Sequence, residues 1–365
     1  MSKLKIGIVG CGGIAKQKHF PALAFLKDEV EITYFCDIIE ERAVTGAKEH
    51  GIPGAKATTS YKELLKDSSI DIVYVLTPNV SHSEISCAAL EAGAHVMCEK
   101  PMAINYAEGK KMVDTAKKSG KKLTVGYQNR FRRDSRELFA RSRGGELGDI
   151  YFAKAHAIRR RGVPTWGVFP DKSKQGGGPL IDIGTHALDL TLWFMNNYQP
   201  ESVLGQTFQK LKDYPDGNMF GPWDPGKFET EDSAFGLIRM KNGATIYLEA
   251  SWALNMLNAK EAQVTLCGTK AGAEMYGDAW KNEGYTEINK VEHGVLVSTG
   301  PSAAGGIFGF AGTGSQAPGD LEARQWIDAI RNNTEPLVHP EEALVVTQIL
   351  EAIYESAKNG KAIYF

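Results

Sequence analysis

Apolar and polar positions alternate in two different ways along the first third of the chain. Short runs rich in β-branched residues predict buried strands, at residues 4–9, 30–36, 70–76, 95–98 and 123–127. Longer amphipathic stretches lie between them, at residues 40–50, 61–66, 81–92 and 106–119. Strands that alternate with helices are typical of parallel βαβ units. We therefore predict an α/β fold whose N-terminal domain, residues 1–127, is a Rossmann doubly wound parallel sheet.

The pattern changes after residue 127. A basic helix is predicted at 131–143, a strand at 150–158 and an apolar helix from residue 179 to about 196. Further strands are predicted at 203–208, 231–240, 245–252 and 262–267, and the turn Lys241-Asn242-Gly243 favours antiparallel pairing. Helices at 321–332 and 340–358 close the chain after a Gly-, Ala- and Ser-rich loop at 299–319. The C-terminal domain, residues 128–365, is thus predicted to be α+β with a large, mainly antiparallel sheet, and its last helix is a candidate to pack back on the first domain.

Composition narrows the class of protein. The 365 residues are 42% hydrophobic and 24% charged, as in ordinary globular proteins. A net charge of −2 lacks the basic excess that nucleic acid or an anionic membrane attracts, and no apolar run is long enough to span a bilayer. Five cysteines without a Cys-x-x-Cys pair indicate buried thiols in a reducing compartment. With no secretory leader pattern after Met1, we expect a cytoplasmic protein whose partner is a small molecule.

A glycine-rich turn follows the first predicted strand. It has the pattern G-x-G-x-x-A and consists of Gly10, Gly12, Gly13, Ile14 and Ala15. Glycines between a strand and a helix allow a tight turn and bring backbone amides close to a pyrophosphate. Asp37 ends the next predicted strand, where a carboxylate binds the adenine ribose hydroxyls. A carboxylate there opposes a 2′-phosphate, so NAD is favoured over NADP, with Arg42 the residue to suspect if NADP is used.

Polar residues follow two neighbouring predicted strands. Glu99 and Lys100 come after the strand at 95–98, and Thr77, Asn79 and His82 come after the strand at 70–76. A lysine at a strand end is, taken alone, more often a solvated surface charge. Because parallel sheets bind ligands at the carboxyl ends of their strands, these two strand ends predict one crevice.

The predicted helix from residue 179 carries a second group of candidate residues. Three glycines at 176–178 precede it, and apolar residues occupy most of its circumference. Asp182 and His186 lie one helical turn apart, and a histidine beside a carboxylate is a candidate general base. We assign His186 as the proton acceptor, Lys100 as the group that polarises the substrate oxygen, and Asp182 as the residue that orients the substrate. The roles of His186 and Lys100 are exchangeable at this point, because a sequence gives no distances.

Arginines are frequent between Arg130 and Arg143 and again at 159–161. The ordinary explanation is a solvated helix face with local ion pairs, and the functional alternative is that the arginines bind an acidic or phosphorylated substrate. No close set of Cys and His residues predicts a metal site. Trp166 lies in the loop before the triple glycine, where it either stacks on nicotinamide or a sugar or packs in the domain interface.

These motifs together resemble the Gfo/Idh/MocA oxidoreductase family, over nearly the whole chain. The resemblance rests on the glycine turn with Asp37, Thr77-Pro78-Asn79 with His82, Glu99-Lys100-Pro101, Gly126-Tyr127 with Arg130-Phe131, and Asp182-x-x-x-His186. It implies that Lys100, Asp182 and His186 are the catalytic residues. With the motifs, it assigns cofactor binding to Gly10, Gly12, Gly13, Ile14, Asp37, Thr77, Asn79, His82, Glu99, Lys100 and Gln128. The expected substrate-binding residues are Lys100, Arg130, Trp166, Asp182 and His186.

The function expected from this resemblance is hydride transfer between NAD and a secondary alcohol of a cyclic polyol or sugar. It also implies an open-faced C-terminal sheet that forms homodimers or homotetramers. Two alternatives stay open: an NAD-dependent glycoside hydrolase of the same family, and a non-catalytic NAD-binding regulator that responds to sugars. The presence of Lys100, Asp182 and His186 argues against the regulator. Net NADH formation separates the dehydrogenase from the hydrolase, because the hydrolytic cycle regenerates its cofactor.

Overall fold

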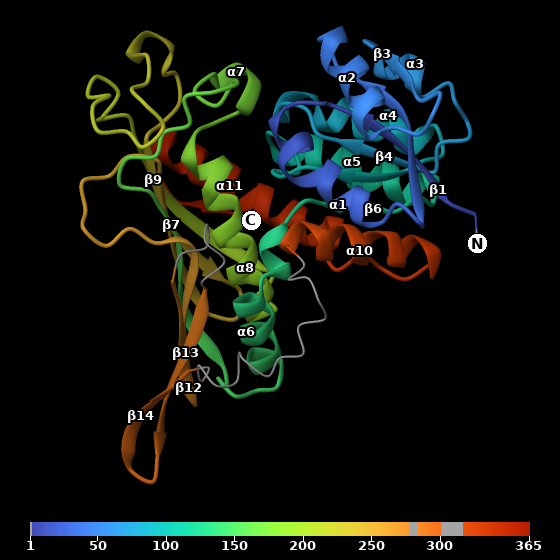
Figure 1. Cartoon of the computed structure of the whole chain (residues 1–365). Coiled ribbons are helices and arrows are strands. Elements are labelled where there is room, and N and C mark those ends of the chain that lie inside the picture. Colours follow the sequence, from blue (N-terminus) through green and yellow to red (C-terminus); the bar gives the residue numbers. More distant parts are fainter. Residues whose placement is uncertain (1, 278–283, 301–316) are drawn as a thin grey trace. The chain divides into compact units, whose positions relative to one another are not determined.

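The computed structural model describes residues 2–277, 284–300 and 317–365 (Figure 1). The chain folds into two units. The first contains Met1–Gln128 and Gln316–Leu344, and the second contains Asn129–Ser315 and Val345–Phe365. The division expected from the sequence places the whole of 128–365 in one domain, whereas residues 316–344 belong to the unit formed by the N-terminal segment.

The first unit is built on a six-stranded sheet in which every pair of neighbours is parallel. In spatial order its strands are β3 (Lys56–Thr58), β2 (Val30–Cys36), β1 (Leu4–Val9), β4 (Ile72–Val75), β5 (His95–Cys98) and β6 (Leu123–Val125). This 3-2-1-4-5-6 order is that of the dinucleotide-binding sheet, so the predicted Rossmann fold is confirmed. The strand order reverses between β1 and β4, which is where such sheets bind their ligands.

Helices follow the strands of the first unit in the expected alternation. They are η1 (Ala15–His19, a π-helical turn), α1 (Phe20–Phe25), α2 (Glu40–His50), α3 (Tyr61–Leu64), the 3₁₀ helix η2 (Asn79–Ser81), α4 (His82–Glu91), α5 (Tyr106–Ser119) and α10 (Pro318–Arg331). Helix α10 was predicted as a closing helix of the C-terminal domain. Its Trp326 and Ile327 instead join Ile6 and Phe35 in the apolar core of the first unit.

The second unit contains a nine-stranded mixed sheet. In spatial order its strands are β14 (Val295–Thr299), β13 (Tyr285–Glu292), β12 (Ala271–Tyr276), β11 (Glu261–Gly268), β7 (Ile150–Ile158), β10 (Thr245–Ser251), β9 (Ser233–Met240), β8 (Pro200–Phe208) and β15 (Ile363–Tyr364). Only β7 and β10 pair in parallel among these described strands, so the mainly antiparallel sheet is confirmed. The predicted hairpin at Lys241-Asn242-Gly243 joins β9 to β10.

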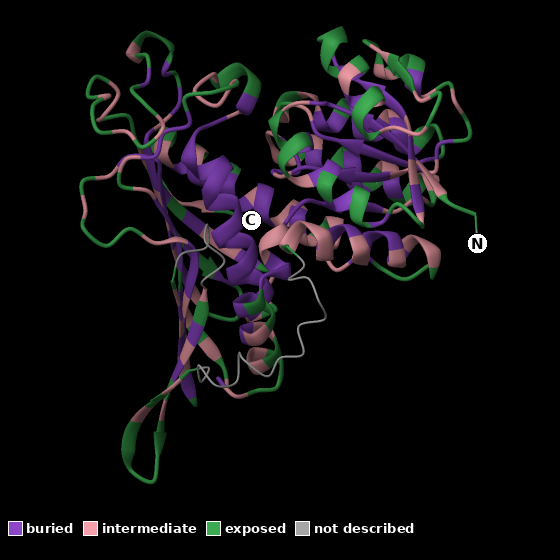
Figure 2. Cartoon of the chain, in the orientation of Figure 1, coloured by how far each residue is buried: buried purple, intermediate pink, exposed green. Residues whose placement is uncertain are grey.

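One face of this sheet is covered by a buried helical segment. The π-helical turn η4 (Leu180–Gly184) and helix α8 (Thr185–Met195) contact β7, β10 and β11, and Figure 2 shows α8 almost wholly buried. Small residues let the helix approach closely: a Cβ on Gly184 would lie 3.0 Å from the Cβ of Ala250. The other helices with described residues in this unit are α6 (Arg133–Arg143), α7 (Lys172–Gln175), α11 (Pro340–Asn359) and the short 3₁₀ helices η3 (Gln128–Phe131) and η5 (Pro225–Lys227).

Several elements differ from the prediction. Strand β3, helix α7 and strands β12 to β15 were not predicted, and the predicted helix at 179–196 begins as a π-helical turn. Most of the predicted loop at 299–319 lies outside the described residues. In the part of the chain that the structure describes, no helix is long and apolar enough to cross a membrane.

Candidate active site

The glycine turn after β1 has the shape that a dinucleotide requires. Gly10 has φ +101°, and a Cβ there would lie 2.5 Å from the carbonyl oxygen of Leu76, so the turn needs glycine at this position. A Cβ on Gly12 or Gly13 would meet no atom within 4 Å. These two glycines therefore border open space, and no side chain keeps a pyrophosphate away from their backbone amides.

Asp37 is fixed beside this turn. Its Oδ2 accepts a hydrogen bond from the backbone N–H of Cys11 at 2.8 Å, and its Oδ1 accepts one from the N–H of Ile39 at 2.9 Å. The carboxylate follows the carboxyl end of β2, where the adenine ribose lies in this fold. The glycine cradle and the oriented carboxylate fit an NAD molecule, which the residues of the first unit alone would hold by its adenosine and pyrophosphate.

His82 is a structural residue of the strand ends rather than an exposed ligand. It is fully buried, with Nδ1 2.8 Å from the carbonyl oxygen of Pro101 and Nε2 2.9 Å from that of Thr77. Burial lowers its pKa, so the neutral ring donates to one of these carbonyls. His82 thus ties together the loops after β4 and β5. Thr77 also accepts a 2.8 Å bond from the hydroxyl of Ser81.

Glu99 is the centre of a buried polar cluster that the sequence did not reveal. Its Oε1 lies 2.7 Å from Nζ of Lys18 and 2.8 Å from Nε2 of His19. Lys18 also contacts Glu322 of α10 at 2.8 Å and Gln128 at 3.2 Å. Gln128, expected to bind cofactor, is therefore a member of this cluster.

Charge in the cluster is divided unequally between the two carboxylates. Burial alone would raise the pKa of Glu99, but Lys18 and His19 hold it well below its usual range. Burial raises the pKa of Glu322 to about 7. Glu99 accepts bonds from Lys18 and His19, whereas Oε1 of Glu322 has no hydrogen-bond partner among the residues that the structure describes. The ionised carboxylate is Glu99, and Glu322 holds a proton into the neutral range.

Lys100 follows directly on this cluster. Its backbone N–H donates to Oε2 of Glu99 at 3.0 Å, and the Lys100–Pro101 peptide bond is cis. The side chain is neither fully exposed nor fully buried. Glu99 thus fixes the backbone from which the Lys100 side chain projects.

The second unit holds the other predicted catalytic residues. Asp182 lies in η4 and His186 in the first turn of α8, and each is less than a tenth exposed. Trp252, directly after β10, donates its indole N–H to Oδ2 of Asp182 at 3.0 Å. Its structural task is to hold the Asp182 carboxylate.

Arg130 does not lie free for a substrate in this structure. Its guanidinium is fully buried and makes an ion pair with Asp189 of α8 at 2.6 Å, stacked near the ring of Trp193. Arg132 pairs in the same way with Asp134, and Arg159 with Glu261 at 2.6 Å. These arginines therefore form ion pairs, as the ordinary explanation expects, but Arg130 is buried rather than on a solvated face, and its partner and that of Arg159 lie far along the chain. The expectation that Arg130 binds substrate gains no support.

Trp166 is half exposed, as a binding surface requires. Its ring meets Phe169 and Phe220 edge-on, with centroids 5.8 and 4.8 Å away, and its relative exposure is 50%. Phe169 in turn contacts the ring of Trp252, which holds Asp182. The exposed tryptophan is thus connected through packed aromatic rings to a predicted catalytic carboxylate.

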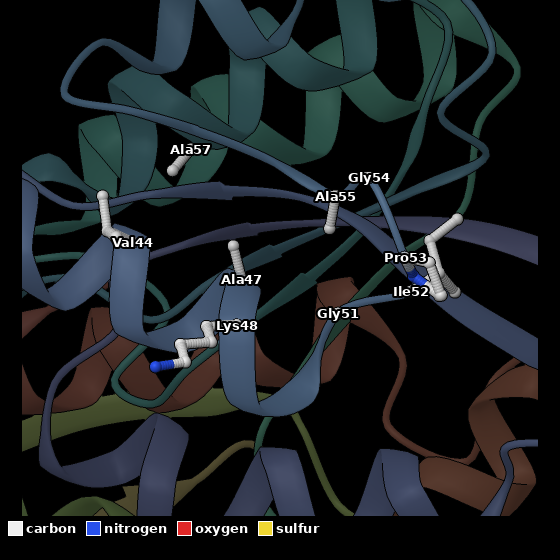
Figure 3. Close-up of a pocket in the computed structure, with 9 residues that line it drawn as sticks. All are labelled: Val44, Ala47, Lys48, Gly51, Ile52, Pro53, Gly54, Ala55 and Ala57. Atoms are coloured by element: carbon white, nitrogen blue, oxygen red, sulfur yellow. The ribbon is translucent and has the colours of Figure 1, made fainter.

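A hollow of about 440 Å³ lies elsewhere in the first unit (Figure 3). It is bordered by the second half of α2 and the turn into β3, and Lys48 is its one charged lining residue among those described. None of the predicted site residues lines it. It therefore contributes nothing to the candidate site.

Comparison with protein families matches both parts of the chain. Residues 4–127 match the model described as "Oxidoreductase family, NAD-binding Rossmann fold", and residues 143–365 match "Oxidoreductase family, C-terminal alpha/beta domain". The D-glucoside 3-dehydrogenase of Escherichia coli (strain K12) is 34% identical over 362 residues, which cover 99% of this chain and 97% of that protein. An inositol 2-dehydrogenase of Salmonella typhimurium is 28% identical over 194 residues, covering 53% and 55% of the two chains.

Solved structures share the fold. Levoglucosan dehydrogenase in complex with NADH and levoglucosan superposes with a TM-score of 0.83 at 21% identity, covering 100% of this chain and 99% of the other. An aldose-aldose oxidoreductase from Caulobacter crescentus, complexed with glycerol, gives 0.79 at 23% identity over the full length of both chains.

Proposed function

Because the chain belongs to the Gfo/Idh/MocA family of NAD-binding oxidoreductases, we propose that it is an NAD-dependent dehydrogenase that oxidises a secondary alcohol of a sugar or cyclic polyol. The observation that carries the proposal is the pair Asp182 and His186 in a buried, mainly apolar helical segment. An acid–base pair in such surroundings has the chemistry that removal of a hydroxyl proton needs. The glycine cradle of the first unit supplies the place for the cofactor.

NAD is the proposed cofactor, in preference to NADP. When bound, its nicotinamide supplies the hydride acceptor. Asp37 supports the preference because both of its oxygens are oriented by backbone amides, and an oriented carboxylate repels a 2′-phosphate while accepting hydrogen bonds from ribose hydroxyls.

The proposed roles follow the chemistry of the alcohol. His186 accepts the hydroxyl proton, the Lys100 ammonium stabilises the negative charge that develops on the oxygen, and Asp182 orients the sugar through a neighbouring hydroxyl. Trp252 supports this role of Asp182 by holding one of its carboxylate oxygens. Glu99 supports the role of Lys100 by accepting a hydrogen bond from the Lys100 backbone N–H.

A glycoside or another ring sugar is the proposed substrate class. The half-exposed ring of Trp166 supports it, because aromatic faces stack on the apolar faces of pyranose rings. The likeness to D-glucoside 3-dehydrogenase over 99% of this chain points to the same class.

A screen for NADH formation tests the proposal. We expect absorbance at the NADH band to rise with glucosides, free sugars or inositols as substrates. Sugar cleavage without net NADH would identify the hydrolase, and NAD binding without turnover on any of them would identify a regulator.

Substitution of the proton acceptor tests the assigned roles. Loss of a general base costs about 10²- to 10⁴-fold, so His186→Ala and Lys100→Ala should each lower kcat on that scale while NAD still binds. The His186 variant should also lose the near-neutral limb of its pH profile, which the Lys100 variant should keep. Loss of that limb in the Lys100 variant instead would identify Lys100 as the proton acceptor and His186 as the polarising group. Near-normal turnover in either variant would show that the substituted residue takes no part in the mechanism.

A further inference from the structure

Glu231 lies at the start of the helix that carries Asp182, and nothing in its sequence context predicts a task for it. Its Oε1 accepts hydrogen bonds from the backbone N–H of Gly178 at 2.9 Å and of Leu180 at 3.3 Å. Its Oε2 also lies 3.0 Å from the N–H of Gly178. The first amides of a helix have no partner within it, and this carboxylate supplies one from the segment before β9.

Tyr354 of α11 completes the arrangement. Its hydroxyl donates to Oε1 of Glu231 at 2.7 Å. The carboxylate therefore bridges α11 and the first turn of η4. These contacts join three segments of the second unit: Glu231 lies 53 positions from Gly178 and 123 positions from Tyr354 in the chain.

The triple glycine is explained by this close packing. A Cβ on Gly177 would lie 2.0 Å from the hydroxyl oxygen of Tyr354, and one on Gly178 would lie 2.4 Å from the carbonyl oxygen of Glu231. Gly176 has φ +83°, which favours glycine at the end of α7. Gly177 and Gly178 thus have a steric reason in the close packing against Tyr354 and Glu231, whereas Gly176 is favoured by the end of α7.

We propose that Glu231 and Tyr354 are positioning residues for Asp182 and His186, an inference that rests on the proposed dehydrogenase function. They act through the backbone: Glu231 holds the amides of Gly178 and Leu180, and the amide of Asp182 bonds to the carbonyl of Gly178 at 3.0 Å. The indole of Trp252 holds the other end of Asp182, its carboxylate. Backbone and side chain of Asp182 are therefore fixed by separate groups.

The π-helical turn makes this support necessary. In a π-helical turn the backbone hydrogen bonds join residues five positions apart. This geometry is less favourable than that of an α-helix, so it persists where surrounding contacts stabilise it. Here it sets the angle between Asp182 in η4 and His186 in α8. Without the Glu231 carboxylate, relaxation toward an ordinary helix would turn Asp182 relative to His186.

Tyr354→Phe is the sharpest test, because it removes one hydroxyl and leaves the ring. A hydrogen bond to a charged group and a small displacement of a catalytic residue both correspond to about 10- to 100-fold. We expect kcat for the sugar substrate to fall by that factor while the KM for NAD changes less than about twofold. A purely structural loss would lower the active fraction of enzyme, so kcat is measured per NAD-binding site.

Tyr74→Phe is the matched control. The hydroxyl of Tyr74 is buried in the first unit and has no hydrogen-bond partner among the described residues. Its removal should leave kcat and the KM values near wild type. Glu231→Gln keeps an oxygen for the amides and should lose less activity than Glu231→Ala. In the double variant Glu231→Gln/Tyr354→Phe, the fold-decrease in kcat should be smaller than the product of the two single decreases, because both substitutions act on the same Tyr354–Glu231 hydrogen bond.

Hydrogen exchange provides a readout that needs no turnover. The amides of Gly178 and Leu180 should exchange faster in Tyr354→Phe and Glu231→Ala than in wild type, and those in Tyr74→Phe should not. Faster exchange in Tyr354→Phe and Glu231→Ala, together with a wild-type protein that turns over no sugar, would keep the contact and reject the proposed function. Unchanged kcat together with unchanged exchange in Tyr354→Phe would overturn the positioning role, as would faster exchange with normal kcat.

Discussion

Asp37 uses both oxygens to hold its own loop, and this affects how its role in cofactor choice can be tested. Cys11 and Ile39 each donate a backbone N–H to the carboxylate. A substitution therefore removes a ribose partner and loosens the glycine turn together. Serine keeps one oxygen for these amides and is a milder change than alanine.

We expect Asp37→Ser to lower kcat/KM for NAD by about 10-fold or more and to narrow the gap to NADP, since a charged hydrogen-bond acceptor is lost and its repulsion of a phosphate disappears. Steady-state kinetics with both cofactors measure this. Asp114→Ser is the control, because Asp114 is an exposed carboxylate of α5 paired with Lys110. Higher efficiency with NADP in the wild-type protein would reject the assignment and direct attention to Arg42.

Residues with local sequence signals were predictable, and residues with distant partners were not. Asp37 stands at a fixed spacing from the glycine turn, and both lie where the pattern placed them. Arg130 pairs with Asp189, 59 positions away, and Glu231 bonds to Gly178, 53 positions away. Composition cannot tell a buried ion pair from a substrate-binding arginine, because the difference lies in the partner that folding supplies.

At the scale of elements, helix α10 brings a buried carboxyl group to the first unit. Glu322 is almost completely buried beside Lys18, and burial raises its pKa to about 7, above the usual 4.5. A carboxyl group whose pKa is raised in the folded state stabilises the fold fully below its unfolded pKa. That contribution is lost as the pH rises through the folded pKa.

We therefore expect Glu322→Gln to gain stability relative to wild type as the pH rises from about 5 to about 8. The difference in unfolding free energy between the two proteins should change by on the order of 1 to 3 kcal/mol, since glutamine has no proton to lose. Urea unfolding at several pH values measures it. Parallel pH curves for the two proteins would show that Glu322 does not titrate in this range.

Elements with a clear hydrophobic periodicity were predicted well, whereas a very short strand and a π-helical turn were missed. Strands β2 and β5 and helices α2 and α5 lie within the predicted bounds. Strand β3 has three residues at a sheet edge, too few to show alternation. The π-helical turn η4 has the apolar pattern of an α-helix, and the residues that contact its start, Glu231 and through it Tyr354, are distant in the chain.

At the scale of the whole molecule, the nine-stranded sheet has an apolar area on the face away from α8. Leu204 of β8 and Leu237 of β9 are direct cross-strand partners, and they are 53% and 47% exposed. Tyr247 of β10 lies next in the same row. Exposed apolar pairs on a sheet face are typical of surfaces that other subunits cover.

We expect the protein to form a homodimer or homotetramer through this face. Light scattering at micromolar concentration should report more than one subunit, and Leu204→Glu/Leu237→Glu should shift the protein toward the monomer with little loss of secondary structure. Leu296→Glu, in the exposed strand β14 at the opposite edge of the sheet, is a control for a charge added elsewhere on the sheet. A wild-type monomer would contradict the expectation.

The order of residues in the first unit has a consequence for protein synthesis. Residues 316–344 complete a unit that begins at the N-terminus, and their Trp326 and Ile327 fill its core. Domains usually fold in turn as they leave the ribosome, but here the first sheet must wait for about two hundred further residues before α10 arrives. During that time the apolar surface beneath α10 is open to chaperones and to other nascent chains. A truncated chain that ends at residue 128 would leave this apolar surface permanently exposed, whereas a chain in which residues 317–344 are joined to 1–128 would have the missing part of the core.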